Sequence, residues 1–104
     1  MKKITINELE ISINSAERVI LEFSTEWCGP CRMVKPILEE ISSETDIAVF
    51  EVDVDEEIEL AEKFGIRNIP TTLYYKNGKV ISKTVGANPK SRILEQFDKE
   101  INND

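Results

Sequence analysis

Two kinds of apolar pattern alternate along this chain, and together they predict its strands and helices. Short runs of consecutive apolar residues, typical of buried strands, occupy residues 19–23 and 47–54. A weaker alternation over residues 2–6 favours an edge strand. Residues 31–43 instead repeat their apolar side chains at helical spacing, and one face of that helix carries Val34, Ile37, Leu38 and Ile41.

Cap and turn residues predict where the helices begin and end. Asn7 should cap a short first helix, with Glu10 completing a capping-box pair. Pro36 lies inside the second helix and should kink it. Asp55 should cap the third helix, and Gly65 fits the position just beyond its end. The inner face expected for this third helix holds Ile58, Ala61 and Phe64.

The last third of the chain predicts a hairpin followed by a helix. The pair Asn77-Gly78 separates residues 71–76 from residues 79–85 and is the strongest short signal for a hairpin. The pair Asn88-Pro89 should supply the cap and the first residue of a last helix, whose apolar face holds Ile93, Leu94, Phe97 and Ile101. The predicted order is β-α-β-α-β-α-β-β-α, an α/β fold. Helix crossovers imply parallel strands first, and the hairpin then adds antiparallel ones.

Chain length and net charge limit the number of domains and the kinds of partner to expect. The chain has 104 residues, so we expect one domain over residues 1–104, and a monomer. The formal net charge of −7 argues against a nucleic-acid partner, which would require a basic face. Eleven of the 20 acidic residues lie between Glu39 and Glu62, with no Lys or Arg among them. Two interpretations stay open: a solvated acidic side that aids solubility, and a surface that steers a basic partner.

The N-terminal segment gives an expectation about the cellular compartment of the protein. Residues 1–8 include two lysines near the start but no long apolar run, so they predict neither a signal peptide nor a membrane span. We therefore expect a cytoplasmic protein with no membrane partner. Stable disulfides are rare in such a reducing compartment, and a lone Cys-x-x-Cys pair there indicates redox activity.

The only two cysteines lie in the segment Trp27-Cys28-Gly29-Pro30-Cys31. This segment follows the buried strand 19–23 and leads into the helix 31–43, so Cys28 lies at a helix N-terminus. Free backbone N–H groups and the positive end of the helix dipole favour a thiolate there, which is the reactive form of the side chain. The pair is therefore predicted to be a working dithiol/disulfide.

Two inert roles for the cysteine pair are weaker alternatives. A stapling disulfide across so short a loop would stabilise the fold by only about 2 kcal/mol. A zinc site needs four ligands, and the chain has neither a histidine nor a third cysteine. A zinc ion shared between two subunits stays open, but we expect no metal and no bound cofactor.

With these residues in view, the chain resembles the thioredoxin family over nearly all its length. Besides the cysteine segment, Phe64-Gly65-Ile66-Arg67-Asn68-Ile69-Pro70-Thr71 is similar to the family's cis-proline segment. Lys76-Asn77-Gly78-Lys79 is similar to its hairpin turn, and Val85-Gly86-Ala87 to its substrate-binding loop. The resemblance implies the thioredoxin fold, a mixed five-stranded sheet with helices on both faces. It also implies a general reductant of protein disulfides that a thioredoxin reductase restores.

The resemblance assigns roles to the residues of the motif. Cys28 would be the exposed nucleophile that attacks a substrate disulfide, and Cys31 the shielded thiol that resolves the mixed disulfide. Gly29 and Pro30 between them carry no charge. A small apolar patch would surround Cys28 and dock varied disulfides with little selectivity; its members would be Trp27, Gly29, Pro30, Ile69, Pro70, Gly86 and Ala87.

Glu22 is unusual because it lies in the middle of an apolar strand, six residues before Cys28. Thioredoxins usually have a buried aspartate at that place, so Glu22 is expected to accept the proton of Cys31, through a water molecule. Burial would raise its pKa toward neutrality. The alternative is a strand glutamate that faces solvent. Glu51 occupies a place where many bacterial thioredoxins have a lysine, and Lys35 either supplies that positive charge or faces solvent.

Pro70 is expected to follow a cis peptide bond after Ile69, since such bonds mark tight functional turns. That turn would expose the Ile69 backbone to pair with an extended substrate segment. An ordinary trans proline is the alternative.

Two other functions are alternatives to disulfide reduction. A binding module would use the apolar patch and need neither cysteine. An oxidase or isomerase usually has other residues between its cysteines, often histidine, and often a signal peptide.

Overall fold

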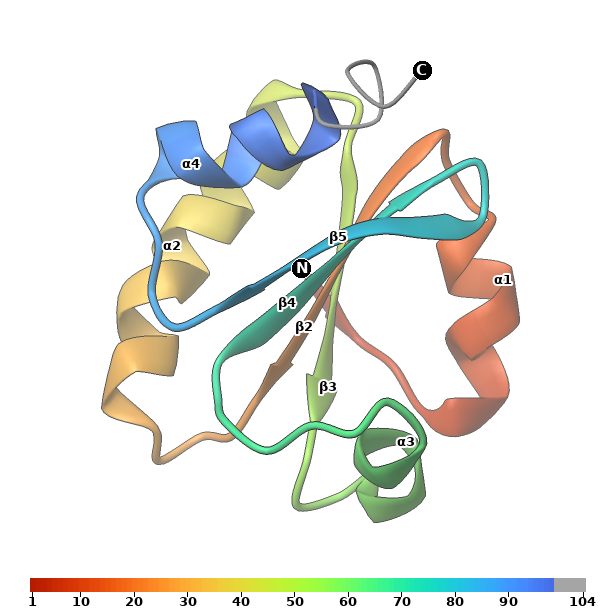
Figure 1. The fold of residues 1–104 in the computed structure, drawn as a ribbon, viewed down its shortest axis with the longest axis vertical. Coiled ribbons are helices and arrows are strands. Elements are labelled where there is room, and N and C mark those ends of the chain that lie inside the picture. The colour runs from red at the N-terminus through yellow and green to blue at the C-terminus, as the bar shows by residue number, and fades with distance from the viewer. Residues whose placement is uncertain (99–104) are drawn as a thin grey trace.

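The computed structural model describes residues 1–98, which form a central five-stranded sheet with helices on both faces. The strands are β1 (Lys2–Lys3), β2 (Arg18–Ser24), β3 (Ala48–Asp53), β4 (Thr71–Lys76) and β5 (Lys79–Val85). The helices are a short 3-10 turn, η1 (Ile6–Glu8), followed by α1 (Leu9–Ile13), α2 (Gly29–Glu44), α3 (Ile58–Lys63) and α4 (Lys90–Glu95). Helices α2 and α4 cover one face, and α1 and α3 the other (Figure 1). The predicted element order and fold class are confirmed.

The sheet is mixed in the way the sequence predicts. Its strand order is β1-β3-β2-β4-β5. β1, β3 and β2 run parallel, whereas β4 is antiparallel to both β2 and β5. β1 is an edge strand as expected, although shorter than residues 2–6. β2 is central, and its C-terminal end leads directly to the cysteine segment.

Alternation along β2 divides the core into two layers. Val19, Leu21 and Phe23 belong to the cluster that packs beneath α1 and α3, whereas Ile20 belongs to the cluster beneath α2 and α4. Because side chains on a strand alternate between faces, Glu22 lies on the same face as Ile20, beneath α2. The predicted inner face of α2 is confirmed, since its residues are buried or half-buried there: Val34, Ile37, Leu38 and Ile41. Pro36 is inside the helix, and the kink stays a prediction.

The predicted caps of the first and third helices are wrong. Thr5, not Asn7, precedes the first helical turn, and the Glu8 carboxylate accepts a hydrogen bond from the Thr5 N–H at 3.0 Å. Thr5 has the extended backbone that a cap needs, so the turn begins two residues before the expected cap pair of Asn7 and Glu10. Asp55 does not cap α3, which starts after Glu57.

Asp53 explains the displaced start of α3. Its Oδ1 accepts hydrogen bonds from the N–H groups of Asp55 at 2.8 Å and Glu56 at 3.2 Å, which fixes a turn before the helix. Contrary to the expected inner face, Ile58 is 61% exposed, and Leu60 is the fully buried residue of α3. Phe64 packs against the core as expected. Gly65 follows the helix with φ of +63°, which confirms its place beyond the end.

The hairpin follows the prediction closely, whereas the last helix differs from it at the cap. Asn77 and Gly78 both have positive φ, 52° and 80°, as a two-residue hairpin turn requires. Pro89 rather than Asn88 is the cap of α4, and the Asn88 amide instead donates to the Gly86 carbonyl at 3.1 Å. Ile93 and Phe97 are buried, and Leu94 packs against the same cluster. Ile101 lies outside the described residues.

Lysines from elsewhere in the chain neutralise part of the acidic segment. Lys90 donates to Glu44 at 2.8 Å and also to Glu40, joining α4 to α2. Lys3 lies 3.7 Å from Glu56 and 3.9 Å from Asp53. The steering of a basic partner by this segment stays a prediction.

Candidate active site

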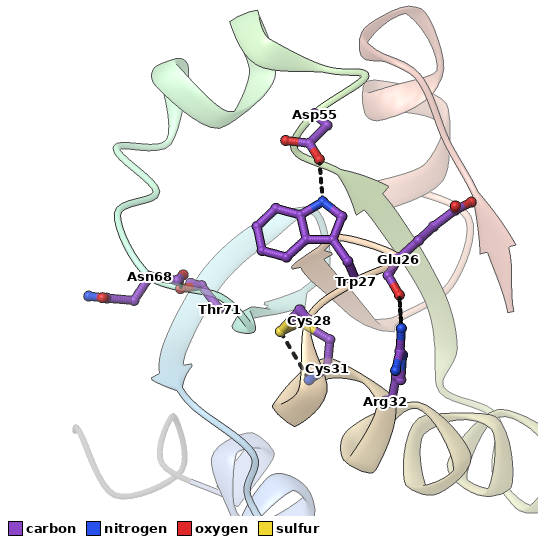
Figure 2. Close-up of a disulfide and its surroundings, with 8 residues drawn as sticks. All are labelled: Glu26, Trp27, Cys28, Cys31, Arg32, Asp55, Asn68 and Thr71. Atoms are coloured by element: carbon purple, nitrogen blue, oxygen red, sulfur yellow. Dashed lines mark hydrogen bonds between the residues drawn. A yellow bond between two sulfur atoms is a disulfide. The ribbon is translucent and has the colours of Figure 1, made fainter.

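The cysteine pair forms the N-terminus of α2. Cys28 is the residue before the first helical turn, and its Sγ accepts a hydrogen bond from the Cys31 N–H at 3.2 Å (Figure 2). Pro30 fits this first turn because it has no N–H to satisfy there. The two cysteines are joined as a disulfide. In the reduced protein the same N–H and the dipole of a 16-residue helix would stabilise a thiolate at Cys28.

Exposure does not distinguish the two cysteines, contrary to the expectation of an exposed nucleophile and a shielded partner. Cys28 is 6% exposed and Cys31 is 5% exposed. The reason is that the Cys28 side chain folds back over the helix terminus to receive the Cys31 N–H. Their surroundings do differ. The described residues that line a cavity of about 400 Å³ beneath α2 include Cys31 but not Cys28.

Trp27 is 68% exposed and lies beside Cys28 (Figure 2). Its indole Nε1–H donates to Asp55 Oδ2 at 2.9 Å, which ties the cysteine segment to the turn before α3. Sequence reasoning missed this use of Asp55, because a contact across 28 residues leaves no local signal. On the other side of the segment, the Arg32 guanidinium donates to the Glu26 carbonyl at 3.1 Å.

The sheet register brings the segment that precedes β4 next to the cysteines. Phe23 near the end of β2 pairs with Thr71 at the start of β4, so the residues that precede Thr71 lie beside the cysteine segment. Figure 2 shows Asn68 and Thr71 together on one side of the disulfide. The Ile69–Pro70 peptide bond is cis, as predicted.

The loop after β5 contacts the segment that precedes β4. The Gly86 N–H donates to the Pro70 carbonyl at 2.8 Å. Pro70 is buried and Ile69 is half-buried, whereas Ala87 is exposed. Gly29 and Pro30 are exposed beside them at the helix start. The three loops of the expected patch therefore meet at one end of the sheet, although the Pro70 side chain contributes little open surface. Their role in substrate binding stays a prediction.

Glu22 is buried, so the alternative of a solvent-facing glutamate is wrong. It is 1% exposed, and its Oε2 has no hydrogen-bond partner within residues 1–98. Burial, and then the nearby Glu51 carboxylate, raise the pKa of Glu22 to about 8, against a smaller lowering by Lys35. Glu22 and Cys31 line the same cavity. A carboxyl with this pKa can take or give a proton near neutral pH.

Both residues left open beside Glu22 prove to be its neighbours. Glu51 is the register partner of Glu22 on the adjacent strand β3, so the two side chains lie on the same face of the sheet. Lys35 reaches down from α2 and places its Nζ 3.9 Å from Glu51 Oε1. The Lys35 side chain is half exposed and that of Glu51 is 14% exposed. Lys35 therefore lies near two carboxyl groups in the lining of the cavity.

Neither a metal centre nor a membrane helix is found in the described part of the chain. Within residues 1–98, no three His, Cys, Asp or Glu side chains are grouped to hold a metal ion. None of the helices in the same range is both long enough and apolar enough to span a bilayer.

Comparisons with known proteins agree with this geometry. The thioredoxin family model matches residues 1–99. Thioredoxin from Bacillus subtilis is 36% identical over 104 residues, covering 97% of this chain and 100% of that protein. Thioredoxin M-type, chloroplastic, from Pisum sativum is 40% identical over 94 residues, 88% of this chain, and this chain spans 55% of the pea protein. The structure of Plasmodium falciparum thioredoxin, 38% identical, superposes with a TM-score of 0.83 and covers 95% of this chain and 98% of its own. The chain belongs to the thioredoxin family and is a thiol–disulfide oxidoreductase with protein-disulfide reductase activity.

Proposed function

We propose that Cys28 attacks the substrate disulfide and that Cys31 resolves the product. The observation that carries this assignment is the hydrogen bond from the Cys31 N–H to Cys28 Sγ at the start of α2. It favours the thiolate at Cys28 and leaves Cys31 over the cavity that contains Glu22. Gly29 and Pro30 keep the turn short and uncharged.

The reaction proceeds in two exchanges. The Cys28 thiolate attacks one sulfur of the substrate disulfide, forms a mixed disulfide and releases the first substrate thiolate. Cys31 then gives its proton to Glu22, and its thiolate attacks Cys28 Sγ. The bond between Cys28 and the substrate breaks, the Cys28–Cys31 disulfide forms, and the second substrate thiolate leaves. Two electrons pass to the substrate, which takes up protons from solvent.

Substrate docking would use the uncharged loops around Cys28. The exposed Trp27 indole and the Ala87 segment offer apolar contact, and the Ile69 backbone beside Pro70 would pair with an extended chain. Gly86, held against the Pro70 carbonyl, keeps that edge free of a side chain. The residues proposed for this surface carry no charge, which suits a reductant that accepts many disulfides.

The proposed cellular role is electron transport that maintains redox homeostasis in the cytoplasm. A thioredoxin reductase would return the Cys28–Cys31 disulfide to the dithiol, with no bound cofactor in this chain. The family membership and the single cysteine pair support this role.

Reduction of insulin disulfides with dithiothreitol tests the assignment. Cys28→Ser should abolish activity, because the remaining thiol, that of Cys31, lines the cavity and is not placed to attack a substrate. Cys31→Ser should instead accumulate a mixed disulfide through Cys28, visible by mass spectrometry. Turnover by Cys31→Ser at the parent rate would refute the assigned roles. If a Cys28→Ser/Cys31→Ser protein fully replaces the parent protein in cells, the redox-independent binding module would be favoured.

A further inference from the structure

Two buried side-chain polar atoms in the described residues lack any hydrogen-bond partner, and the residues that carry them line the same cavity. They are Glu22 Oε2 and Thr25 Oγ1. Thr25 lies in the turn between β2 and α2 and is 6% exposed. A buried hydroxyl without a partner costs stability, so such an atom needs an explanation. Cys31 lines the cavity beside them.

The cavity is polar enough and large enough to hold water. Its volume is about 400 Å³, against roughly 30 Å³ for one water molecule in the liquid. A buried water needs two to four polar partners. The Glu22 carboxylate, the Thr25 hydroxyl and the Cys31 thiol provide three.

We propose that Thr25 is a positioning residue of the proton transfer, holding with Glu22 Oε2 the water molecule through which Cys31 loses its proton. This inference rests on the proposed role of Glu22 as proton acceptor. The Thr25 hydroxyl donates to the water, and the water donates to Glu22 Oε2 and accepts from the Cys31 S–H. As the proton of Cys31 moves to the water, a proton of the water moves to the carboxylate, so the water is regenerated. The Cys31 thiolate then attacks Cys28 Sγ and releases the substrate thiolate.

Other charged groups surround Glu22 and bear on any pH dependence. β3 supplies Glu51 and Asp53, α2 supplies Lys35 and Arg32, β4 supplies the Tyr74 phenol, β1 supplies Lys3 and the loop before α2 supplies Glu26. None of these groups is altered when Thr25 is replaced. A change in the pH profile on replacing Thr25 therefore reports on the hydroxyl and not on the charge around Glu22.

The test compares Thr25→Val, which keeps the shape and removes the hydroxyl, with Thr25→Ser, which keeps the hydroxyl. Each is measured in the parent and in a Glu22→Gln background. Reduced protein is mixed with excess insulin, quenched with acid at intervals, and the decay of the mixed disulfide is followed by mass spectrometry from about pH 6 to 9. A free thiol has a pKa of about 8.5 and needs less help above it. Thr25→Ala carries the same prediction as Thr25→Val, should the valine variant fail to fold.

Losing one hydrogen bond predicts that Thr25→Val resolves the mixed disulfide about 2- to 10-fold more slowly below pH 8, and that the difference narrows toward pH 9. Thr25→Ser should restore the parent rate. In the Glu22→Gln background, Thr25→Val should add no further loss. If Glu22→Gln slows resolution but Thr25→Val does not, or slows it equally in both backgrounds, Thr25 has no part in the transfer. If Glu22→Gln resolves at the parent rate, the proposed acceptor itself is wrong.

Discussion

Glu22→Gln should make the protein more stable, and the gain should grow with pH. Glu22 is 1% exposed and its pKa is raised from an ordinary value of 4.5 to about 8. The folded state therefore holds this proton more tightly than the unfolded state. As pH climbs above 4.5 the unfolded chain releases the proton, and this ionisation stabilises the unfolded state but not the folded state. The penalty stops growing above about pH 8, where the folded protein also ionises.

The size of the effect follows from the pKa values. One pKa unit corresponds to about 1.4 kcal/mol, so the full shift from 4.5 to about 8 destabilises the ionised protein by about 5 kcal/mol. The same linkage gives about 1 kcal/mol at pH 5 and about 3 kcal/mol at pH 7. Glutamine does not titrate and keeps nearly the same shape. The gain from Glu22→Gln should therefore increase by about 4 kcal/mol between pH 5 and pH 9.

Urea unfolding of both proteins at several pH values measures this difference. Any fixed cost of burying the amide shifts the whole curve without changing its slope, so the slope with pH is the decisive quantity. Glu39→Gln, on the exposed side of α2, is the matched control and should give a nearly flat difference. Parallel pH curves for the parent and Glu22→Gln would refute the account of Glu22 as a buried carboxyl whose pKa is raised to about 8.

Two further predictions concern the neighbours of the site. Glu51→Gln should lower the pKa of Glu22, because it removes the facing carboxylate, and Lys35→Met should raise it; carbon NMR of the labelled carboxyl measures both, and shifts in the same direction would contradict the arrangement. Asp55→Ala should reduce kcat/KM for protein disulfides by about 2- to 10-fold, because the indole loses the acceptor that orients it, whereas Asp55→Asn should stay near the parent. Equal activity of the alanine and asparagine variants would mean that the Trp27–Asp55 contact does not matter for docking.

Most of the fold could be predicted from short sequence motifs, because each of these motifs favours one backbone conformation. Asn77-Gly78 predicts the hairpin, since both residues tolerate the positive φ that the turn requires. The caps failed where several polar residues compete within a few positions. Thr5 displaced Asn7 at the first helix, and a turn held by Asp53 delays the start of α3 past Asp55. Thr, Asn and Asp all favour caps and turns, and only tertiary packing selects among them.

The site was predictable where one motif contains it and unpredictable where the sheet register assembles it. Cys28 and Cys31 follow from a five-residue segment at a strand-to-helix turn. The choice between Lys35 and Glu51 could not be made, because it depends on the pairing of Glu22 with Glu51 across β2 and β3 and on α2 crossing above them. Thr25 gave no signal, since its unpartnered hydroxyl is visible only in the folded cavity.

The reduction potential of the Cys28–Cys31 couple tests the central claim most directly. It can be measured by equilibrating the protein with dithiothreitol buffers and following Trp27 fluorescence beside the disulfide. Membership of the thioredoxin family assigns this couple to a net reductant of protein disulfides. Strong stabilisation of the Cys28 thiolate would instead favour the dithiol form and raise the potential. We expect a value close to that of thioredoxins as a family, about −270 mV. A value near −120 mV, typical of a strong periplasmic oxidant, would reverse the direction of electron flow and contradict it.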